Sequence, residues 1–120
     1  MRLNKVSTLL KSILSTHCSN VARLYTAKKT QTFIVYHLVD TTPQNYSDDK
    51  RQGTEYYYRI DIFSKKDYLT FVEEIVKSLE QNEFYGIKLN EEMFETETSY
   101  YHIPMDVYFF DNEDNESEEE

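Results

Sequence analysis

Residues 55–63 constrain the fold of this chain more than any other segment, because their side chains alternate with a period of two. Apolar and aromatic side chains at every second position are typical of a β-strand. One face of the predicted strand consists of Tyr56, Tyr58, Ile60 and Ile62. The other face consists of Tyr57, Arg59, Asp61 and Phe63. We expect helices to cover the first face. The second face meets either a protein partner or water, and the alternation leaves both alternatives open.

Two helices are predicted, one before and one after this strand. Apolar residues at helical spacing predict amphipathic helices over about residues 4–16 and about residues 66–81. The first stripe is Leu3, Val6, Leu9, Leu10, Ile13 and Leu14, and the second is Tyr68, Phe71, Val72, Ile75, Val76 and Leu79. Ser64 followed by Asp67 matches a capping box, which places the start of the second helix directly after Ser64.

Alternation also predicts strands at residues 32–39 and 99–110, with shorter strands near residues 21–25 and 87–89. Pro104 lacks an amide hydrogen, so we expect it at a sheet edge or a bulge. Two amphipathic helices packed on one mixed or mostly antiparallel sheet form an α+β fold. A chain of 120 residues makes a single domain, which we place at residues 1–110.

Two polar segments lie outside this framework. Residues 40–54 are expected to form a long protruding loop, a poorly packed, hairpin-like arm whose tip consists of Asp48, Asp49, Lys50 and Arg51. Residues 111–120 carry seven acids and no base, so we expect a disordered acidic tail that buries nothing. We expect the tip of the arm to contact an oligomer neighbour or another partner, together with Tyr57, Arg59 and Asp61.

Charge is unevenly distributed along the chain. The net charge is −9, yet residues 1–39 contain six Lys or Arg and no Asp or Glu. We expect folding to mix the segments, so that this polarity averages out. An acidic chain disfavours nucleic-acid binding through a basic patch. No apolar run reaches the roughly 20 residues of a membrane span, so no membrane interaction is expected. The single cysteine, Cys18, excludes an internal disulfide.

No arrangement of residues in the sequence is typical of a catalytic site. The two glycines form no phosphate-binding loop, and the three histidines and Cys18 match no metal spacing. A nuclease-like set of Asp61, Glu95, Glu97 and Asp106 lacks the positioned lysine of such enzymes. We therefore expect no enzyme activity and no cofactor, and the residues favour a binding or assembly module. Eleven Tyr and seven Phe suit subunit contacts, although cross-strand pairs within a sheet explain them nearly as well.

Two segments in the second half of the chain carry a family resemblance. Residues 60–64 (Ile-Asp-Ile-Phe-Ser) and 94–102 (Phe-Glu-Thr-Glu-Thr-Ser-Tyr-Tyr-His) resemble small tail-terminator proteins of long-tailed phages of Gram-positive bacteria, which join the tail to the head. The motif of that family looks like Tyr-Glu-x-Asp-Thr-x-x-Tyr-His followed by a final strand. Here Phe94 replaces the Tyr and Glu97 replaces the Asp. The match covers roughly residues 4–110, but its specific part is short.

The resemblance implies a structural role in a virion. Such proteins look like α+β subunits of a six-membered ring that sits on the end of the tail tube, stops tube polymerisation and docks the head connector. The implied partners are further copies of the chain, the tail tube protein and the head-completion or connector protein. DNA would pass through the ring lumen without specific binding. The implied location is the head–tail interface of the virion, after assembly in the host cytoplasm, and the family pattern names no catalytic residue.

A second hypothesis comes from a different class of protein. A small acidic monomer of this kind would act as a regulatory or inhibitory protein by DNA mimicry, because its acidic surface would occupy a basic cleft. Sizing by light scattering separates a ring from such a monomer.

Overall fold

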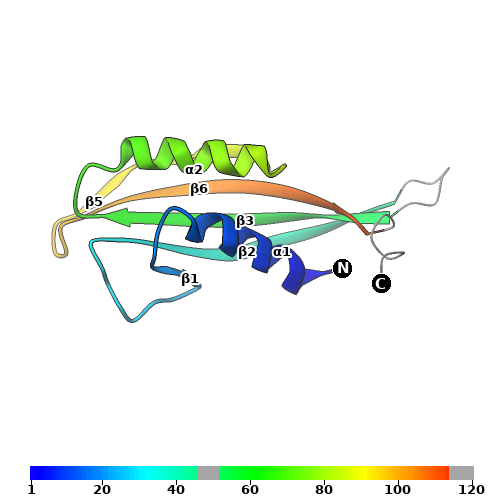
Figure 1. Cartoon of the computed structure of the whole chain (residues 1–120), viewed down its shortest axis with the longest axis horizontal. Coiled ribbons are helices and arrows are strands. Elements are labelled where there is room, and N and C mark those ends of the chain that lie inside the picture. Colours follow the sequence, from blue (N-terminus) through cyan, green and yellow to red (C-terminus); the bar gives the residue numbers. More distant parts are fainter. Residues whose placement is uncertain (46–51, 114–120) are drawn as a thin grey trace.

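The computed structural model describes residues 1–45 and 52–113. Its order is α1 (Leu3–Ser15), β1 (Val21–Arg23), β2 (Thr32–Asn45), β3 (Gln52–Ser64), α2 (Leu69–Gln81), β4 (Tyr85–Leu89), β5 (Met93–Glu95) and β6 (Tyr100–Asn112). Two helices and one six-stranded mixed sheet make an α+β fold, as predicted (Figure 1). The predicted tip residues Asp48, Asp49, Lys50 and Arg51 lie outside the described residues, as does residue 114 onward.

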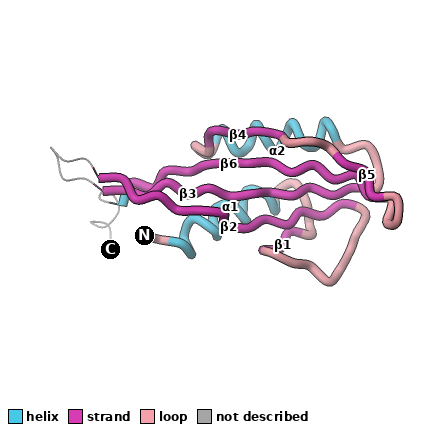
Figure 2. The backbone as a smooth tube through the Cα atoms, turned by 180° about the vertical axis from the view of Figure 1, so that it is seen from behind, coloured by secondary structure: helices cyan, strands magenta, loops and turns pink. Residues whose placement is uncertain are grey.

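The three long strands β2, β3 and β6 form the centre of the sheet. The strand order is β1-β2-β3-β6-β4, and β5 pairs with β6 beyond the end of β4. Among the described strands, β1 and β2 run parallel and the other pairs are antiparallel. Both helices lie on the same side of the sheet, in front of it in Figure 1 and behind it in Figure 2. The opposite side therefore carries no helix of the described part of the chain, and we call it the open face.

The core lies between the sheet and the two helices. The alternation of β3 turns Tyr56, Tyr58, Ile60 and Ile62 toward the helices, and each is at most 1% exposed. The helices supply Val6, Leu10, Ile13, Leu14, Val72, Ile75 and Leu79. Burying a large apolar side chain stabilises a fold by about 1.5–3 kcal/mol. The predicted inner face of β3 and both predicted helical stripes are confirmed, except for Leu3, which is 45% exposed.

The segment predicted as a poorly packed, hairpin-like arm, residues 40–54, has antiparallel strand pairing over its described residues. β2 continues to Asn45 and β3 begins at Gln52, with Pro43 opposite Thr54. Thr54 is 3% exposed, and a β-carbon at Gly53 would collide with the Phe110 ring of β6. The base of the hairpin is thus tightly packed. The apolar alternation that predicts this strand ends at residue 39, because a bulge between Leu38 and Asp40 shifts the register. Beyond the bulge β2 continues through polar residues, which carry no strand signal in the sequence.

The second helix begins at Leu69, three residues later than predicted. The Ser64 hydroxyl is buried and lies 2.9 Å from the hydroxyl of Thr32 on β2, so it belongs to the sheet and not to a capping box. The N-cap position is Tyr68, and the carboxylate of Asp67, one residue earlier, accepts a hydrogen bond from the Leu69 amide at 3.3 Å.

Pro104 lies inside the sheet, in β6, between β3 and the β4–β5 connection. Its carbonyl accepts a hydrogen bond from the Asn90 amide at 2.8 Å. The amide and carbonyl of one strand residue point to the same side, so the missing N–H of Pro104 faces the connection between β4 and β5. No hydrogen bond to β3 is lost, which explains how a proline is accommodated in an inner strand.

The start of the chain is tied to the end of β6. β6 runs to Asn112, so Asp111 and Asn112 belong to the sheet, although the sequence placed them in the acidic tail. Asp111 is 4% exposed and accepts two hydrogen bonds from the Arg2 guanidinium, both at 2.9 Å. The Arg2 amide donates to the Tyr56 hydroxyl at 2.8 Å. The expectation that residues from Asp111 onward bury nothing is therefore wrong for Asp111.

Asp111→Ala is expected to destabilise the protein by about 1.5–3 kcal/mol, because it leaves the charge of Arg2 without its bidentate partner. Urea unfolding of the two proteins measures the difference. The control is a chain ended after Glu113, whose midpoint should match that of the full chain. Equal stability of Asp111→Ala and wild type would show that the Arg2–Asp111 pair contributes nothing.

Ile75→Asp is expected to prevent stable folding, because Ile75 is fully buried and an unpaired buried charge costs several kcal/mol. The matched control is Glu74→Asp at the neighbouring, exposed position of α2. Thermal unfolding followed by circular dichroism separates the two variants. An unchanged midpoint for Ile75→Asp would overturn the assignment of the core face of α2.

Candidate functional site

The open face is built from cross-strand rows of side chains on β2, β3 and β6. Strand register sets each row, and the rows run from one end of the sheet toward the other. Figure 2 views the sheet from this side. The four central rows are Phe33, Phe63 and His102; Val35, Asp61 and Pro104; His37, Arg59 and Asp106; and Asp40, Tyr57 and Tyr108.

The first row is a stack of rings. The ring centroids of Phe33 and Phe63 lie 4.6 Å apart, and those of Phe63 and His102 lie 4.1 Å apart, with nearly parallel planes in both pairs. Nε2 of His102 lies 2.8 Å from a carboxylate oxygen of Asp61 in the next row. The stack and this pair hold the side chains of the first two rows in one arrangement.

The next rows contain a polar network centred on Asp106. One of its carboxylate oxygens accepts hydrogen bonds from Nε of Arg59 at 2.7 Å and from the Tyr57 hydroxyl at 2.8 Å. The other oxygen accepts one from the Asn90 side chain at 3.0 Å. The Tyr57 ring stacks on Tyr108, with centroids 4.7 Å apart. Burial by itself would raise the pKa of Asp106, but the hydrogen bonds from Asn90, Tyr57 and Arg59 outweigh it and lower this pKa.

One end of the open face is hollowed into a cavity of about 720 Å³. Its floor is the ring stack with Asp61, Val35 and Tyr100. One wall is the connection at residues 24–31, which Asn20 holds in place by donating to the Lys28 carbonyl. The opposite wall is the turn that carries Glu95, Glu97 and Thr98. The segment that resembles tail terminators, residues 94–102, thus forms one wall and part of the floor.

The structure brings three of the predicted interface residues together. Tyr57, Arg59 and Asp61 all lie on the open face, each bonded to a residue of β6. Asp106 and His102 also lie on this surface, which the sequence pattern by itself did not predict. Within β6 they alternate with Ile103 and Met105, so they lie on the opposite face of the strand. Once the pairing of β6 with β3 is known, this alternation assigns them to the open face.

Several of the side chains weighed as catalytic groups have structural roles. The His17 ring lies 2.8 Å from the Ser78 hydroxyl and links the end of α1 to α2. Burial raises the pKa of the Cys18 thiol, which contacts the carbonyls of Asn20 and Thr32 at 3.6 Å. A protonated, buried thiol is a poor nucleophile. Within residues 1–45 and 52–113 no group of three or more His, Cys, Asp or Glu side chains is placed to hold a metal ion.

Among the described residues, neither helix combines the length and the apolar character that a membrane crossing requires. A scan of protein-family models finds no match to this sequence, and neither does a search of curated proteins. Among solved structures, a chain from the virion of a native gene transfer agent particle is similar, with 9% sequence identity and a TM-score of 0.40. The likeness covers 88% of this chain and 85% of that chain. A likeness this distant establishes neither a shared fold nor a shared function.

Asp106→Asn is expected to lower the free energy of unfolding at about pH 7 by about 1–3 kcal/mol, because the amide loses the charge-assisted hydrogen bonds. The folded-state pKa of Asp106 lies below its ordinary value of 3.8, so this stability is present above that value. It is lost as the pH falls through the folded-state pKa. Urea midpoints of both proteins between about pH 7 and about pH 2.5 should therefore converge.

The control for this experiment is Glu73→Gln, which changes an exposed carboxylate on α2, away from the open face. A stability gap between wild type and Asp106→Asn that stays constant down to about pH 2.5 would contradict the assigned role of the carboxylate.

Proposed function

We propose that this chain is a structural protein of a phage virion, and specifically a tail terminator. Six subunits form a ring on the end of the tail tube, stop its polymerisation and join the tail to the head connector. The observation that carries the proposal is the open face, which has no helix of the described residues on it and whose cavity is lined at one end by the segment that resembles tail terminators.

The open face has the properties of a surface that docks another protein. Tyrosine and arginine are enriched at the centres of protein interfaces, and here Tyr57, Tyr108 and Arg59 lie side by side. Their rings are already stacked and their charges already paired, so docking would order few further side chains. An Arg59 side chain that is 37% exposed and paired with Asp106 suits a contact that is completed by a neighbour.

The proposed role needs no catalysis and no cofactor. His17, His102 and Cys18 are used within the fold, and Asp61 and Asp106 are bonded to neighbours on the open face. The net charge of −9 would repel DNA phosphates, so a genome would slide through the ring without specific binding. The location that follows is the head–tail interface of the virion, reached after assembly in the host cytoplasm.

DNA mimicry fits the charge distribution less well than assembly does. A mimic presents acidic groups over its binding surface. In this chain residues 1–39 carry six Lys or Arg and no acid, and they include all of α1 and β1. The surface of this protein is therefore not uniformly acidic, as the surface of a DNA mimic would be.

Purified protein mixed with growing tail tubes is expected to cap one end of each tube and to halt elongation. Electron microscopy of the mixture measures both effects. Arg59→Glu should weaken capping, because it places a second carboxylate directly beside that of Asp106 on the open face. The matched control is Thr70→Glu on the exposed side of α2, which adds a negative charge away from this face.

Tubes that keep growing while the wild-type protein stays free in solution would refute the tail-terminator role. A host lysate lacking the protein should contain over-long tails without heads.

A further inference from the structure

The two lateral edges of the molecule carry opposite charge. The strand order places β1 at one edge of the sheet and β4 at the other. Residues 1–39, which we call the basic edge, form α1, β1 and the first half of β2. Residues 67–95, which we call the acidic edge, form α2, β4 and β5. The topology places these two segments on opposite sides of the sheet, although Arg2 and the amino group of Met1 pair with Asp111 and Glu113 at the end of β6.

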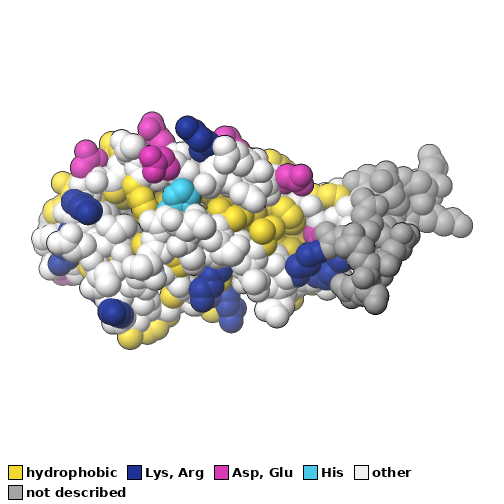
Figure 3. All heavy atoms as spheres, in the orientation of Figure 1, with side chains coloured by type: hydrophobic (Ala, Val, Ile, Leu, Met, Phe, Trp, Pro, Cys, Tyr) yellow, Lys and Arg dark blue, Asp and Glu magenta, His cyan; other side chains and the backbone are white. Residues whose placement is uncertain are grey.

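The charges of each edge are displayed at the surface. In Figure 3 the Asp and Glu side chains gather over α2 and the Lys and Arg side chains gather over α1 and the connection after β1. The basic edge has no acid. Five of its six bases are exposed, namely Lys5, Lys11, Arg23, Lys28 and Lys29, and the sixth, Arg2, is partly buried in its pair with Asp111. The acidic edge has two lysines, and its eight acids, all exposed, are Asp67, Glu73, Glu74, Glu80, Glu83, Glu91, Glu92 and Glu95.

The exposed apolar side chains gather on the same two edges. Among the described residues, the large hydrophobic side chains that are exposed divide equally between them. Those of the basic edge are Met1, Leu3, Leu24, Tyr25, Leu38 and Val39. Those of the acidic edge are Leu69, Tyr85, Leu89, Met93 and Phe94, together with Tyr101 of β6, whose ring packs on Phe94. Apolar side chains collected in this way mark surfaces that bind other proteins.

We propose that the basic edge of one copy of this chain binds the acidic edge of the next copy. Each edge combines apolar side chains with charge of one sign, and the other edge supplies the opposite sign. Pairing of two identical edges is opposed by like charges. The contact therefore joins two different surfaces head to tail, and such contacts continue from copy to copy until a ring closes.

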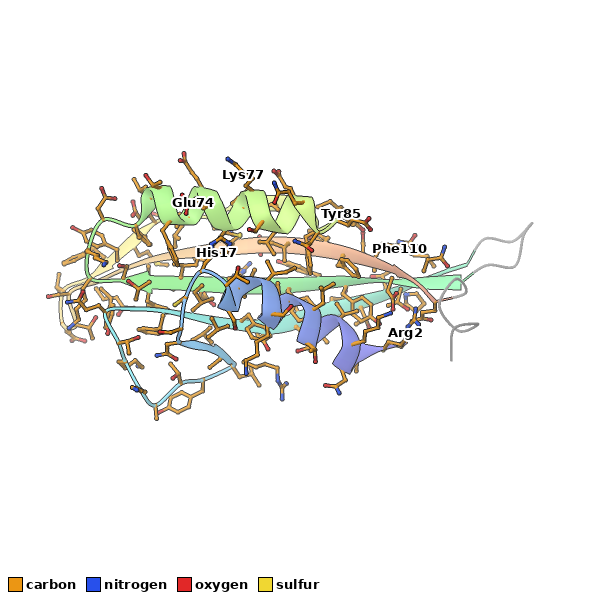
Figure 4. All side chains as sticks on the ribbon, in the orientation of Figure 1. Arg2, His17, Glu74, Lys77, Tyr85 and Phe110 are labelled. Atoms are coloured by element: carbon orange, nitrogen blue, oxygen red, sulfur yellow. The ribbon has the colours of Figure 1, made fainter. Side chains whose placement is uncertain are left out.

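The outward sides of the two helices carry charged side chains that a neighbouring copy could reach. In Figure 4 Glu74 and Lys77 lie on the outer side of α2, whereas His17 lies between the helices, where it bonds to Ser78. The inward sides of α1 and α2 are used in the core, so their outward sides are available to a neighbour. The edge contact names the surfaces through which subunits of the proposed ring would meet. Only the closure of the ring at six subunits rests on the function proposed above.

Charge reversal at each edge tests the contact. A basic-edge variant carries Lys11→Glu, Arg23→Glu and Lys28→Glu, and an acidic-edge variant carries Glu73→Lys, Glu80→Lys and Glu83→Lys. All six positions are exposed, so both variants should fold, which circular dichroism and thermal unfolding check. Sedimentation velocity over rising protein concentration measures self-association.

The wild-type protein is expected to associate reversibly, and salt near 1 M should weaken the association because the Debye length falls to about 3 Å. Each variant alone should associate at least about tenfold more weakly, because its three substitutions cancel the net charge of the altered edge and remove its attraction to the opposite edge. An equimolar mixture of the variants should regain association as pairs, since the unaltered acidic edge of one meets the unaltered basic edge of the other. A single chain carrying all six substitutions should stay weakly associating, because both of its edges are then without net charge.

Three results would overturn the edge contact: a wild-type protein that stays monomeric at every concentration and salt, folded variants that associate like wild type, or a mixture that fails to regain association. Failure of the edge contact and failure of the proposed function are distinguishable. Tube capping that survives both charge reversals would refute the contact alone. Head-to-tail association of a protein that leaves tubes growing would refute the tail-terminator role alone.

Discussion

The two-sided character of β3 is the constraint on which the rest of the structure depends. Its inner residues, from Tyr56 to Ile62, are at most 1% exposed and form the middle of the core. Its outer residues Tyr57, Arg59 and Asp61 bind partners on β6. Because β3 pairs with both β2 and β6, its alternation determines which side of each neighbour meets the helices. A slip of one residue would exchange the core with the open face.

Tyrosine serves both sides of this sheet. On the inner side the Tyr56 hydroxyl accepts a hydrogen bond from the Arg2 amide, and burial raises the pKa of Tyr58 to about 12. These residues place a ring in the core and direct a hydroxyl toward α1. On the open face Tyr57 and Tyr108 stack and Tyr57 bonds to Asp106. The aromatic composition therefore reflects the sheet itself as much as any contact with another subunit, and the proposed function does not depend on it.

The arrangement of surfaces links the fold to assembly. The helices occupy one side of the sheet, which leaves the open face for a different protein, and the strand order separates a basic edge from an acidic edge. Edge-to-edge contacts between copies would leave the open face accessible. A subunit with the proposed function would bind its own copies laterally and other virion proteins through the open face at the same time, as a ring at the junction of tail and head would require.

The sequence by itself determined the α+β class, the two helical stripes and the two faces of β3, because periodicity of side chains is local and needs no partner. Only the tertiary structure decided what these elements meet. The bulge after Leu38 carries β2 through polar residues, and the register of β6 brings Asp106 to Arg59 and His102 to Asp61. The Arg2–Asp111 pair joins residues 109 positions apart. Such pairings depend on how strands and helices fit together in space, and the same topology kept the basic and acidic segments on opposite edges.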